Sequence, residues 1–263
     1  MNNTMKKGIK AKIIEICKKS DLLCRIYEFN PRFTRFCRFG TIAPATYVIN
    51  HEKKLIYVRM CKVANSSIKG AMCEEIDEYH DLHRKVPGSE VLTKEEKEYF
   101  KFSFVRNPYE RLVSCYVNKY VTPKKKFAGQ KQELYMDKYL FGYIRNPKDF
   151  SEFVKKVCKI PPRLEEQHFQ QQYHLLYDRH GNCLVDYVGN YENIQEDFEC
   201  IRQKFNLKPL PHYNKSEKGN WMDYYTLETA ELVYKKYKKD FETFGYNDLY
   251  HELVEYLKSK NVE

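Results

Sequence analysis

The sequence predicts an α/β fold with a mainly parallel central sheet. Short runs rich in β-branched and aromatic residues alternate along the chain with segments whose apolar residues recur at helical spacing, which is typical of strands joined by helical crossovers. The length of 263 residues suits one domain with a core large enough to fold without staples. We expect residues 1–40 to form a basic helical segment, broken at Asn30 and Pro31, and residues 41–263 to form the single domain.

A strand, a loop and a helix within residues 55–79 organise the rest of the chain. Residues 55–58 form a β-branched and aromatic run that predicts a buried strand, and residues 46–50 are its predicted hairpin partner. Apolar residues then recur at helical spacing from Ile68 onward. The polar loop between strand and helix reads CKVANSS and supplies side chains that can cap the helix.

The charge pattern at the start of this helix predicts an anion site. A helix start carries unpaired N–H groups and partial positive charge, so acidic side chains are the usual residues of its first turn. Here the loop carries Lys62, the first turn carries Lys69, and no acid precedes Glu74. Cations at this end of a helix are favourable where a bound phosphate completes the site. The alternative is that both lysines point into water.

A second strand and helix lie within residues 101–120. The strand alternates up to Val105, after which Asn107, Pro108 and Glu110 occupy the positions of a helix cap, a first residue and a third residue. The pattern therefore predicts a strand that ends beside a helix start.

Arg106 stands at the predicted end of this strand. A guanidinium at the carboxyl end of a strand, next to a helix start, can hold a phosphate through a bidentate fork. Ser114 lies off the apolar stripe of the helix, beside Glu110. The alternative for Arg106 is an ion pair with a nearby carboxylate such as that of Glu110.

The remaining elements are predicted from apolar periodicity and turn residues. Helices are expected at 147–159, at 192–205, from Thr226 to Gly245, and at about 247–258. A second hairpin is expected with strands at 173–178 and 183–188.

Five stretches, in this order, resemble the carbohydrate sulfotransferases that use 3′-phosphoadenosine 5′-phosphosulfate as donor. The loop CKVANSS is similar to the 5′-phosphosulfate loop of that family, and FVRNPYERLVSCYVNKY is similar to its 3′-phosphate motif. The other stretches are EEQHFQQQYHLL, VDYVGNYENIQEDFECI and YTLETAELVYKKYKKDFETFGY. Together they cover residues 47–246 and resemble the Golgi chondroitin- and dermatan-type family 2 enzymes and their bacterial relatives. The resemblance implies a P-loop-like three-layer sandwich and sulfuryl transfer to a hydroxyl of a glycan, capsular polysaccharide or glycolipid.

The resemblance also assigns donor-binding residues. Lys62 would contact the phosphosulfate bridge and stabilise charge on the departing phosphate. The two phosphates would be held by Val63, Ala64, Asn65, Ser66, Ser67, Arg106 and Ser114. A slight similarity of KSEKGNW to the Lys-Gly loop of cytosolic sulfotransferases adds Lys215, Ser216 and Lys218, for which an exposed basic turn is the alternative. Two departures from the family pattern are Cys61, where proline is frequent, and Asn107, where many members have aspartate.

An acceptor hydroxyl needs a general base, and histidine is a suitable residue. In related glycan sulfotransferases a histidine between the two nucleotide motifs has this role. His83 and His80 occupy that interval, with His83 preferred. His168, in EEQHFQQQ, matches a family histidine and is the third candidate. The alternative for each is an ordinary surface or core histidine.

The net charge and the cysteine content limit the kinds of binding partner and the cellular compartment that the sequence predicts. The net charge of +10 predicts an anionic partner, with a nucleotide, an acidic glycan, nucleic acid and an anionic membrane all open on charge alone. The resemblance implies a nucleotide donor and a carbohydrate acceptor, with no nucleic acid, and the oligomeric state is left open. Nine cysteines without a CxxC pair predict no zinc site, and no metal is expected. The odd cysteine count and the lack of a signal peptide favour a cytoplasmic protein.

Membrane association is expected to be peripheral at most, at the inner face. No apolar run approaches the ~18 residues of a membrane span. An amphipathic helix within residues 1–40 is predicted to pack on the domain, and a helix lying on a membrane surface is the alternative.

Three other function classes are alternatives to a sulfotransferase. One is a glycan-binding protein that has lost catalysis, and the presence of Lys62, Arg106 and Ser114 argues against it. A P-loop kinase or nucleoside triphosphatase needs GxxxxGK[ST], and neither glycine of that signature is present around Lys62. A basic nucleic-acid-binding module is suggested by the charge and the 23 tyrosines. No nucleic-acid signature appears, however, and the aromatic residues follow core periodicity.

Overall fold

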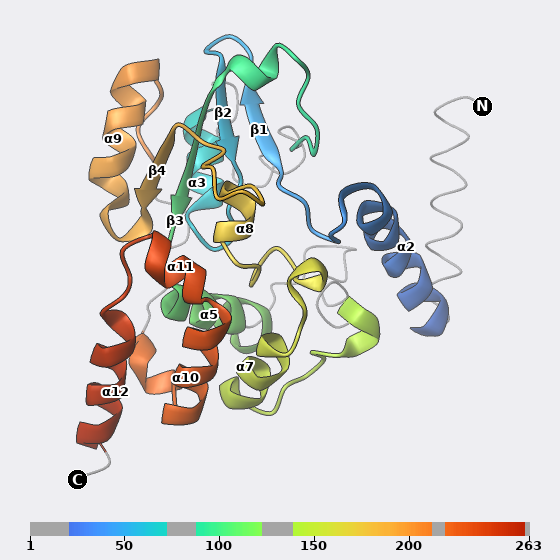
Figure 1. The fold of residues 1–263 in the computed structure, drawn as a ribbon, viewed down its shortest axis with the longest axis vertical. Coiled ribbons are helices and arrows are strands. Elements are labelled where there is room, and N and C mark those ends of the chain that lie inside the picture. The colour runs from blue at the N-terminus through green and yellow to red at the C-terminus, as the bar shows by residue number, and fades with distance from the viewer. Residues whose placement is uncertain (1–20, 73–87, 123–138, 212–218, 261–263) are drawn as a thin grey trace.

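The protein is described here by a computed structural model covering residues 21–72, 88–122, 139–211 and 219–260 (Figure 1). Its sheet has the strand order β1-β2-β3-β4, with β1 at Tyr47–Asn50, β2 at Leu55–Val58, β3 at Phe100–Val105 and β4 at Tyr187–Asn190. β1 pairs antiparallel with β2, whereas β2, β3 and β4 run parallel to one another. The predicted α/β fold with a mainly parallel sheet is therefore confirmed.

Helices flank the sheet and extend beyond the carboxyl ends of its parallel strands (Figure 1). They are α2 (Asp21–Phe39), α3 (Asn65–Met72), α5 (Pro108–Tyr116), α7 (Phe150–Cys158), α8 (Tyr173–Leu176), α9 (Ile194–Phe205), α10 (Leu227–Lys236), α11 (Lys238–Thr243) and α12 (Leu249–Lys260). The helices predicted at 147–159, 192–205 and 247–258 correspond to α7, α9 and α12. All four residues of β2 are buried, as expected of an inner strand of such a sheet.

The three parallel strands end at one edge of the sheet. β2 leads into the loop 59–64 and α3, β3 leads into Arg106 and α5, and β4 leads into Tyr191 and α9. Ligands of open α/β sheets bind outside the carboxyl ends of the strands. The fold therefore brings both predicted phosphate motifs to the edge where a ligand site is expected.

The start of α5 agrees with its sequence signals in all but one contact. The Asn107 side chain accepts a hydrogen bond from the N–H of Tyr109 at 2.9 Å, and Pro108 is the first helical residue. Glu110 does not reach back to the cap, because the N–H of Asn107 donates instead to Glu192 at 2.8 Å. Glu110 is thereby left for Arg106.

The predicted second hairpin is wrong. Its first strand is instead the short helix α8, which begins where the buried carboxylate of Asp240 accepts hydrogen bonds from the N–H groups of Gln172 and Tyr173, at 2.9 and 2.8 Å. In place of the predicted hairpin, the structure contains an isolated antiparallel bridge between Tyr177 and Cys183. A carboxylate from a distant segment thus overrides the local strand pattern.

The N-terminal helix α2 continues through Pro31, so the predicted break is wrong. Contacts with the domain hold the helix despite the missing N–H of proline. Arg32 is buried, with its guanidinium 5.4 Å from the ring centre of Tyr139, and Arg35 pairs with Glu90 at 2.5 Å. These contacts place the second half of α2 on the domain. The amphipathic helix predicted earlier in residues 1–40 lies mostly outside the described residues. None of the described helices is long and apolar enough to cross a membrane.

The helix predicted from Thr226 to Gly245 is divided into α10 and α11. Thr226 caps α10 as expected, exchanging hydrogen bonds with Thr229. At Tyr237 the backbone leaves helical geometry, and the Tyr237 hydroxyl donates to the carbonyl of Phe169 at 2.5 Å. This bond fastens the closing helices to the segment 165–172, which borders the candidate site.

Candidate functional site

The loop between β2 and α3 has an unusual backbone. Lys62 and Ala64 have φ angles of 69° and 43°, a left-handed region that residues other than glycine rarely occupy. Turns of this kind can point successive backbone N–H groups at one anion, and such strain concentrates at functional sites. The Tyr57 hydroxyl supports the loop by accepting a hydrogen bond from the N–H of Met60 at 3.2 Å.

The start of α3 has the features expected of an anion site. Its first turn contains no acidic residue. Val63 and Ser67 are buried, while Ala64, Asn65 and Ser66 are partly exposed. Oδ1 of Asn65 is buried without a hydrogen-bond partner. Because the two ends of an amide can exchange by rotation, Asn65 can instead present its NH₂ group to an anion at the helix start.

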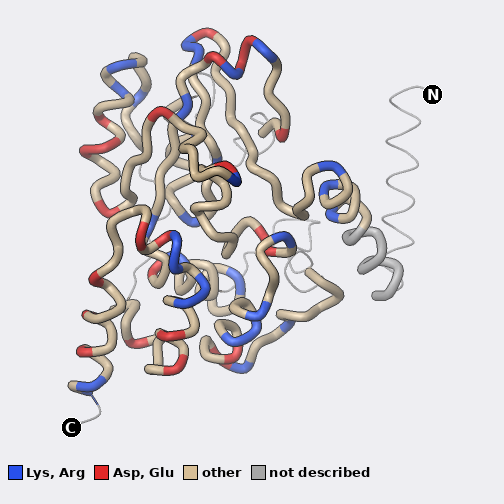
Figure 2. Tube along the Cα trace, in the orientation of Figure 1, with Lys and Arg blue, Asp and Glu red and all other residues tan. Residues whose placement is uncertain are grey.

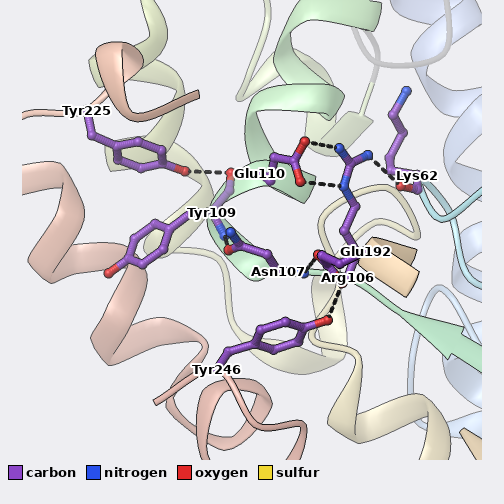
Figure 3. A network of polar contacts seen from close by, with 8 residues as sticks. All are labelled: Lys62, Arg106, Asn107, Tyr109, Glu110, Glu192, Tyr225 and Tyr246. Carbon is purple, nitrogen blue, oxygen red and sulfur yellow. Dashed lines mark hydrogen bonds and ion pairs between the residues drawn. The ribbon is translucent and has the colours of Figure 1, made fainter. Parts of the chain in front are cut away.

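Lys62 is a cation in a poorly solvated position. Burial lowers the pKa of Lys62 to about 8, and the charges of Lys119 and Arg106 act in the same direction. The Lys62 amine points away from the guanidinium of Arg106, whereas the Lys62 carbonyl faces it (Figure 3). A phosphate beside the amine would raise this pKa and favour the charged form.

Arg106 connects the two predicted phosphate motifs. Its Nη1 donates to the carbonyl of Lys62 at 3.1 Å, while Nη2 and Nε bind the carboxylate of Glu110 at 2.5 and 3.4 Å (Figure 3). The guanidinium also lies 4.2 Å from the ring centre of Tyr191, and the residue is 2% exposed. The predicted phosphate fork is therefore engaged by Glu110, and a phosphate here would share the guanidinium with that carboxylate. Ser114 lies one turn beyond Glu110 on α5.

Arg111 is a site residue that the sequence did not reveal. It is 2% exposed, and its guanidinium donates to the carbonyl of Cys61 at 3.0 Å, to that of Gln170 at 2.7 Å and to that of Gln167 at 3.3 Å. Arg106 and Arg111, both on the strand-helix motif, thus hold two consecutive carbonyls of the lysine loop. Nothing in the local pattern distinguishes Arg111 from a solvated arginine on a helix.

Glu192 joins three segments that are far apart in the sequence. One carboxylate oxygen accepts from the N–H of Asn107 at 2.8 Å, and the other accepts from the hydroxyl of Tyr246 at 2.8 Å (Figure 3). Burial raises the pKa of Tyr246, so its hydroxyl stays a donor. The start of α5 is therefore fixed from outside by the segments after β4 and after α11.

Of the three histidines predicted as candidate bases, the structure describes only His168. His83 and His80 lie outside the described residues, as do Lys215, Ser216 and Lys218. His168 is described, and its Nδ1 lies 2.7 Å from Oε2 of Glu166. Within the described ranges no group of three or more His, Cys, Asp or Glu side chains is arranged to hold a metal ion.

The chain is similar to known sulfotransferases over most of its length. The family model described as "Sulfotransferase family" matches residues 45–247. Carbohydrate sulfotransferase 14 of Danio rerio is 26% identical over 236 residues, which cover 76% of this chain and 61% of that protein. Carbohydrate sulfotransferase 11 of Mus musculus is 28% identical over 172 residues, covering 57% and 48%. Carbohydrate sulfotransferase 14 of Homo sapiens is 29% identical over 168 residues, covering 57% and 43%.

The family model covers most of this chain, whereas the chain covers only part of each relative. The chain spans between 43% and 61% of the length of the three relatives named above. No solved structure matches it significantly. The family model, by contrast, extends from just before β1 to just before α12 and includes both phosphate motifs. The chain therefore belongs to the sulfotransferase family.

Proposed function

We propose that the protein transfers a sulfuryl group from 3′-phosphoadenosine 5′-phosphosulfate to a hydroxyl of a carbohydrate. The observation that carries this proposal is the contact between Arg106 and the Lys62 carbonyl, at 3.1 Å. It joins two cationic motifs at the carboxyl ends of neighbouring parallel strands, where a donor with phosphates at two positions could be held at both. The names of the relatives support a carbohydrate as the acceptor.

Sulfuryl transfer is an in-line displacement whose cost lies in positioning the reactants and in stabilising charge on the leaving oxygen. In the proposed reaction the lysine loop and the start of α3 bind the 5′-phosphosulfate, with Lys62 at the bridging oxygen. Arg106 and Ser114 bind the 3′-phosphate. The residues therefore position the donor and neutralise charge, and the acceptor oxygen attacks sulfur from the opposite side.

The proposed donor separates this function from the alternatives. A kinase loop would carry glycines where this chain has Lys62 and Ala64 in left-handed geometry. For a nucleic-acid module a basic face would be expected. In Figure 2 lysine and arginine alternate with aspartate and glutamate along most of the described elements.

Calorimetry with 3′-phosphoadenosine 5′-phosphate (PAP), AMP and ATP tests the donor. We expect PAP to bind roughly 10- to 100-fold more tightly than AMP, because hydrogen bonds to a charged group contribute about 1.5–3 kcal/mol. Ser114→Ala should weaken PAP binding about fivefold and leave AMP binding unchanged. Equal affinity for PAP and AMP, or a preference for ATP with magnesium, would contradict the proposal. Transfer of labelled sulfate to a panel of glycans then identifies the acceptor.

The pKa of Lys62 predicts how PAP affinity depends on pH. The amine is protonated below pH 8 and loses its charge as pH rises through about 8 in the free protein, so PAP binding should weaken above that pH. Calorimetry at pH 7, 8 and 9 should show a loss approaching tenfold per pH unit above 8. Lys62→Gln should remove this dependence. Unchanged affinity up to pH 9 in the wild-type protein would assign the binding charge to other residues.

We also propose a cytoplasmic location, with any membrane association peripheral. The free thiols of the structure include Cys37, Cys61, Cys115, Cys158, Cys183 and Cys200, which is compatible with a reducing compartment. Cell fractionation, with and without residues 1–40, tests this part of the proposal. Recovery of the protein from a membrane fraction after a high-salt wash would contradict it.

A further inference from the structure

We propose that His168, held by Glu166, is the base that accepts the proton of the acceptor hydroxyl. This inference rests on the proposed function and names a catalytic residue for it. It departs from the resemblance to known sulfotransferases, which points to a histidine between the two nucleotide motifs, at His83 or His80.

The geometry of the pair fixes the tautomer of His168. The ring Nδ1 lies 2.7 Å from Oε2 of Glu166, and the backbone N–H of His168 donates to the same oxygen at 2.8 Å. An ionised carboxylate can only accept hydrogen bonds, so Nδ1 carries the proton and Nε2 is the basic atom. The backbone is fixed as well, because the N–H groups of Phe169 and Gln170 donate to the Glu166 carbonyl at 3.0 and 2.9 Å. A carboxylate that orients an imidazole in this way is the arrangement used in general-base catalysis.

Burial separates the roles of the two residues. The Glu166 side chain is 2% exposed and the His168 side chain 16%, so the ring keeps some contact with solvent while the carboxylate has almost none. Oε1 of Glu166 is buried without a hydrogen-bond partner. A buried carboxylate oxygen left in this state costs stability, and such groups are retained where they serve a function. Glu166 is therefore a positioning residue, and His168 is the residue that meets the acceptor.

The pair is fastened to the lysine loop through the residue between its members. Arg111 donates to the carbonyls of both Cys61 and Gln167, at 3.0 and 3.3 Å, and the Gln167 side chain also accepts from Arg59. Cys61 precedes Lys62 directly. The charge of Lys62 also acts on the His168 ring. The histidine therefore borders the place where the sulfuryl group would be transferred.

The surroundings of His168 keep the ring neutral at neutral pH. Burial lowers its pKa below the ordinary 6.5, and the charges of Lys119 and Lys62 act in the same direction against the raising effect of Glu166. Burial opposes ionisation of Glu166, but hydrogen bonds from His168, and the charge of its ring once protonated, lower the pKa of Glu166 below its ordinary value. A neutral imidazole above an ionised carboxylate is the state that a base needs before the reaction.

The proposed step balances as follows. The acceptor oxygen forms a bond to sulfur as its proton passes to Nε2 of His168. The bond between sulfur and the bridging oxygen breaks, and its electron pair leaves on the 5′-phosphate of PAP, where Lys62 stabilises the charge. The imidazolium is stabilised by Glu166 until the proton passes to water. The products are the sulfated acceptor, PAP and one proton.

Turnover of paired variants tests the proposal. The probe is release of PAP from 3′-phosphoadenosine 5′-phosphosulfate, with water alone and with desulfated chondroitin as acceptor. His168→Asn keeps a donor at the Nδ1 position for Glu166 and lacks a base at Nε2, so we expect it to bind PAP normally and to lose about 10²–10⁴-fold in kcat. His168→Ala should recover activity when imidazole is added. The matched control is His251→Asn, in an exposed histidine-glutamate pair on α12 at 3.1 Å, which should leave kcat unchanged.

Glu166→Gln tests whether Glu166 positions His168 for catalysis or only stabilises the fold. The acid limb of the wild-type pH profile should lie below pH 6.5, since activity falls as His168 becomes protonated, and this variant should move it further down because the carboxylate no longer favours the imidazolium. A kcat of His168→Asn within threefold of the wild-type kcat would overturn the assignment of His168 as the base. A loss of kcat in His83→Ala but not in His168→Asn would overturn it as well. A wild-type protein that binds no PAP would overturn the proposed function, and the base assignment with it. Thermal unfolding of each variant identifies those that fail to fold.

Discussion

Replacement of Lys62 by methionine should lower the rate of sulfuryl transfer by about 10²–10³-fold, the loss expected when one preorganised donor to a developing oxyanion is removed. The effect should appear mainly in kcat, because charge on the bridging oxygen develops only as the bond to sulfur breaks. The low solvation that brings the Lys62 pKa to about 8 also strengthens this interaction. Methionine keeps the length of the side chain and removes the charge. The measurement is PAP release at saturating donor.

Lys155→Met is the matched control for this change. Lys155 lies on α7, is 43% exposed and pairs with Glu228 at 2.7 Å, so its loss should change kcat by less than twofold. A Lys62→Met variant with turnover near the wild-type rate would show that the loop binds the donor without taking part in the transfer.

Replacement of Arg111 by methionine should destabilise the protein by at least about 3 kcal/mol. The change leaves three carbonyls that Arg111 now binds without that donor, each at a cost of roughly 1–3 kcal/mol. It also removes the link that Arg111 makes between the lysine loop and the segment that carries His168, while the contact of Arg59 with Gln167 remains. Thermal unfolding should show a midpoint lowered by roughly 6–12 °C, on the usual scale of a few degrees per kcal/mol for a chain of this size.

Two variants distinguish the loss of the three Arg111–carbonyl hydrogen bonds from a general effect of losing an arginine. Arg202→Met removes an arginine that pairs with Glu199 on the surface of α9, and it should leave the unfolding midpoint close to that of the wild type. Arg111→Lys keeps the charge but loses the planar fork, so its stability should fall between wild type and Arg111→Met. Unfolding midpoints that coincide for wild type and Arg111→Met would mean that the loop is held by other contacts.

Local signals in the sequence predict most of the fold. The predictions that are wrong concern elements whose structure depends on tertiary contacts. The cap at Asn107 and the buried strand β2 depend on neighbouring residues, and both are as expected. The strand predicted at residues 173–178 depends on Asp240, whose carboxylate starts a helical turn there. Likewise, Pro31 does not break α2 because the helix packs on the domain. Contacts between distant residues leave no periodic trace in the chain.

The residues of the candidate site also fall into those that the sequence could reveal and those that only the fold could. Lys62 and Arg106 could be selected from sequence because each is a cation at a helix start, where a phosphate is the simplest explanation. The sequence also allows an ion pair between Arg106 and Glu110, and the structure contains that pair. Arg111 could not be selected, since its partners are backbone carbonyls that carry no residue signature. The Glu166–His168 pair is local in sequence, yet its significance depends on Lys62, whose position only the fold reveals.

The hydroxyl of Tyr246 has a consequence for how the protein is made. During translation β2, β3 and their phosphate motifs leave the ribosome first, with Glu192 following and Tyr246 last of the three segments. Until that tyrosine emerges, Glu192 lacks one of its two donors and the start of α5 is only partly anchored. A nascent chain therefore completes the anchoring of α5, and with it the candidate site, only late in synthesis.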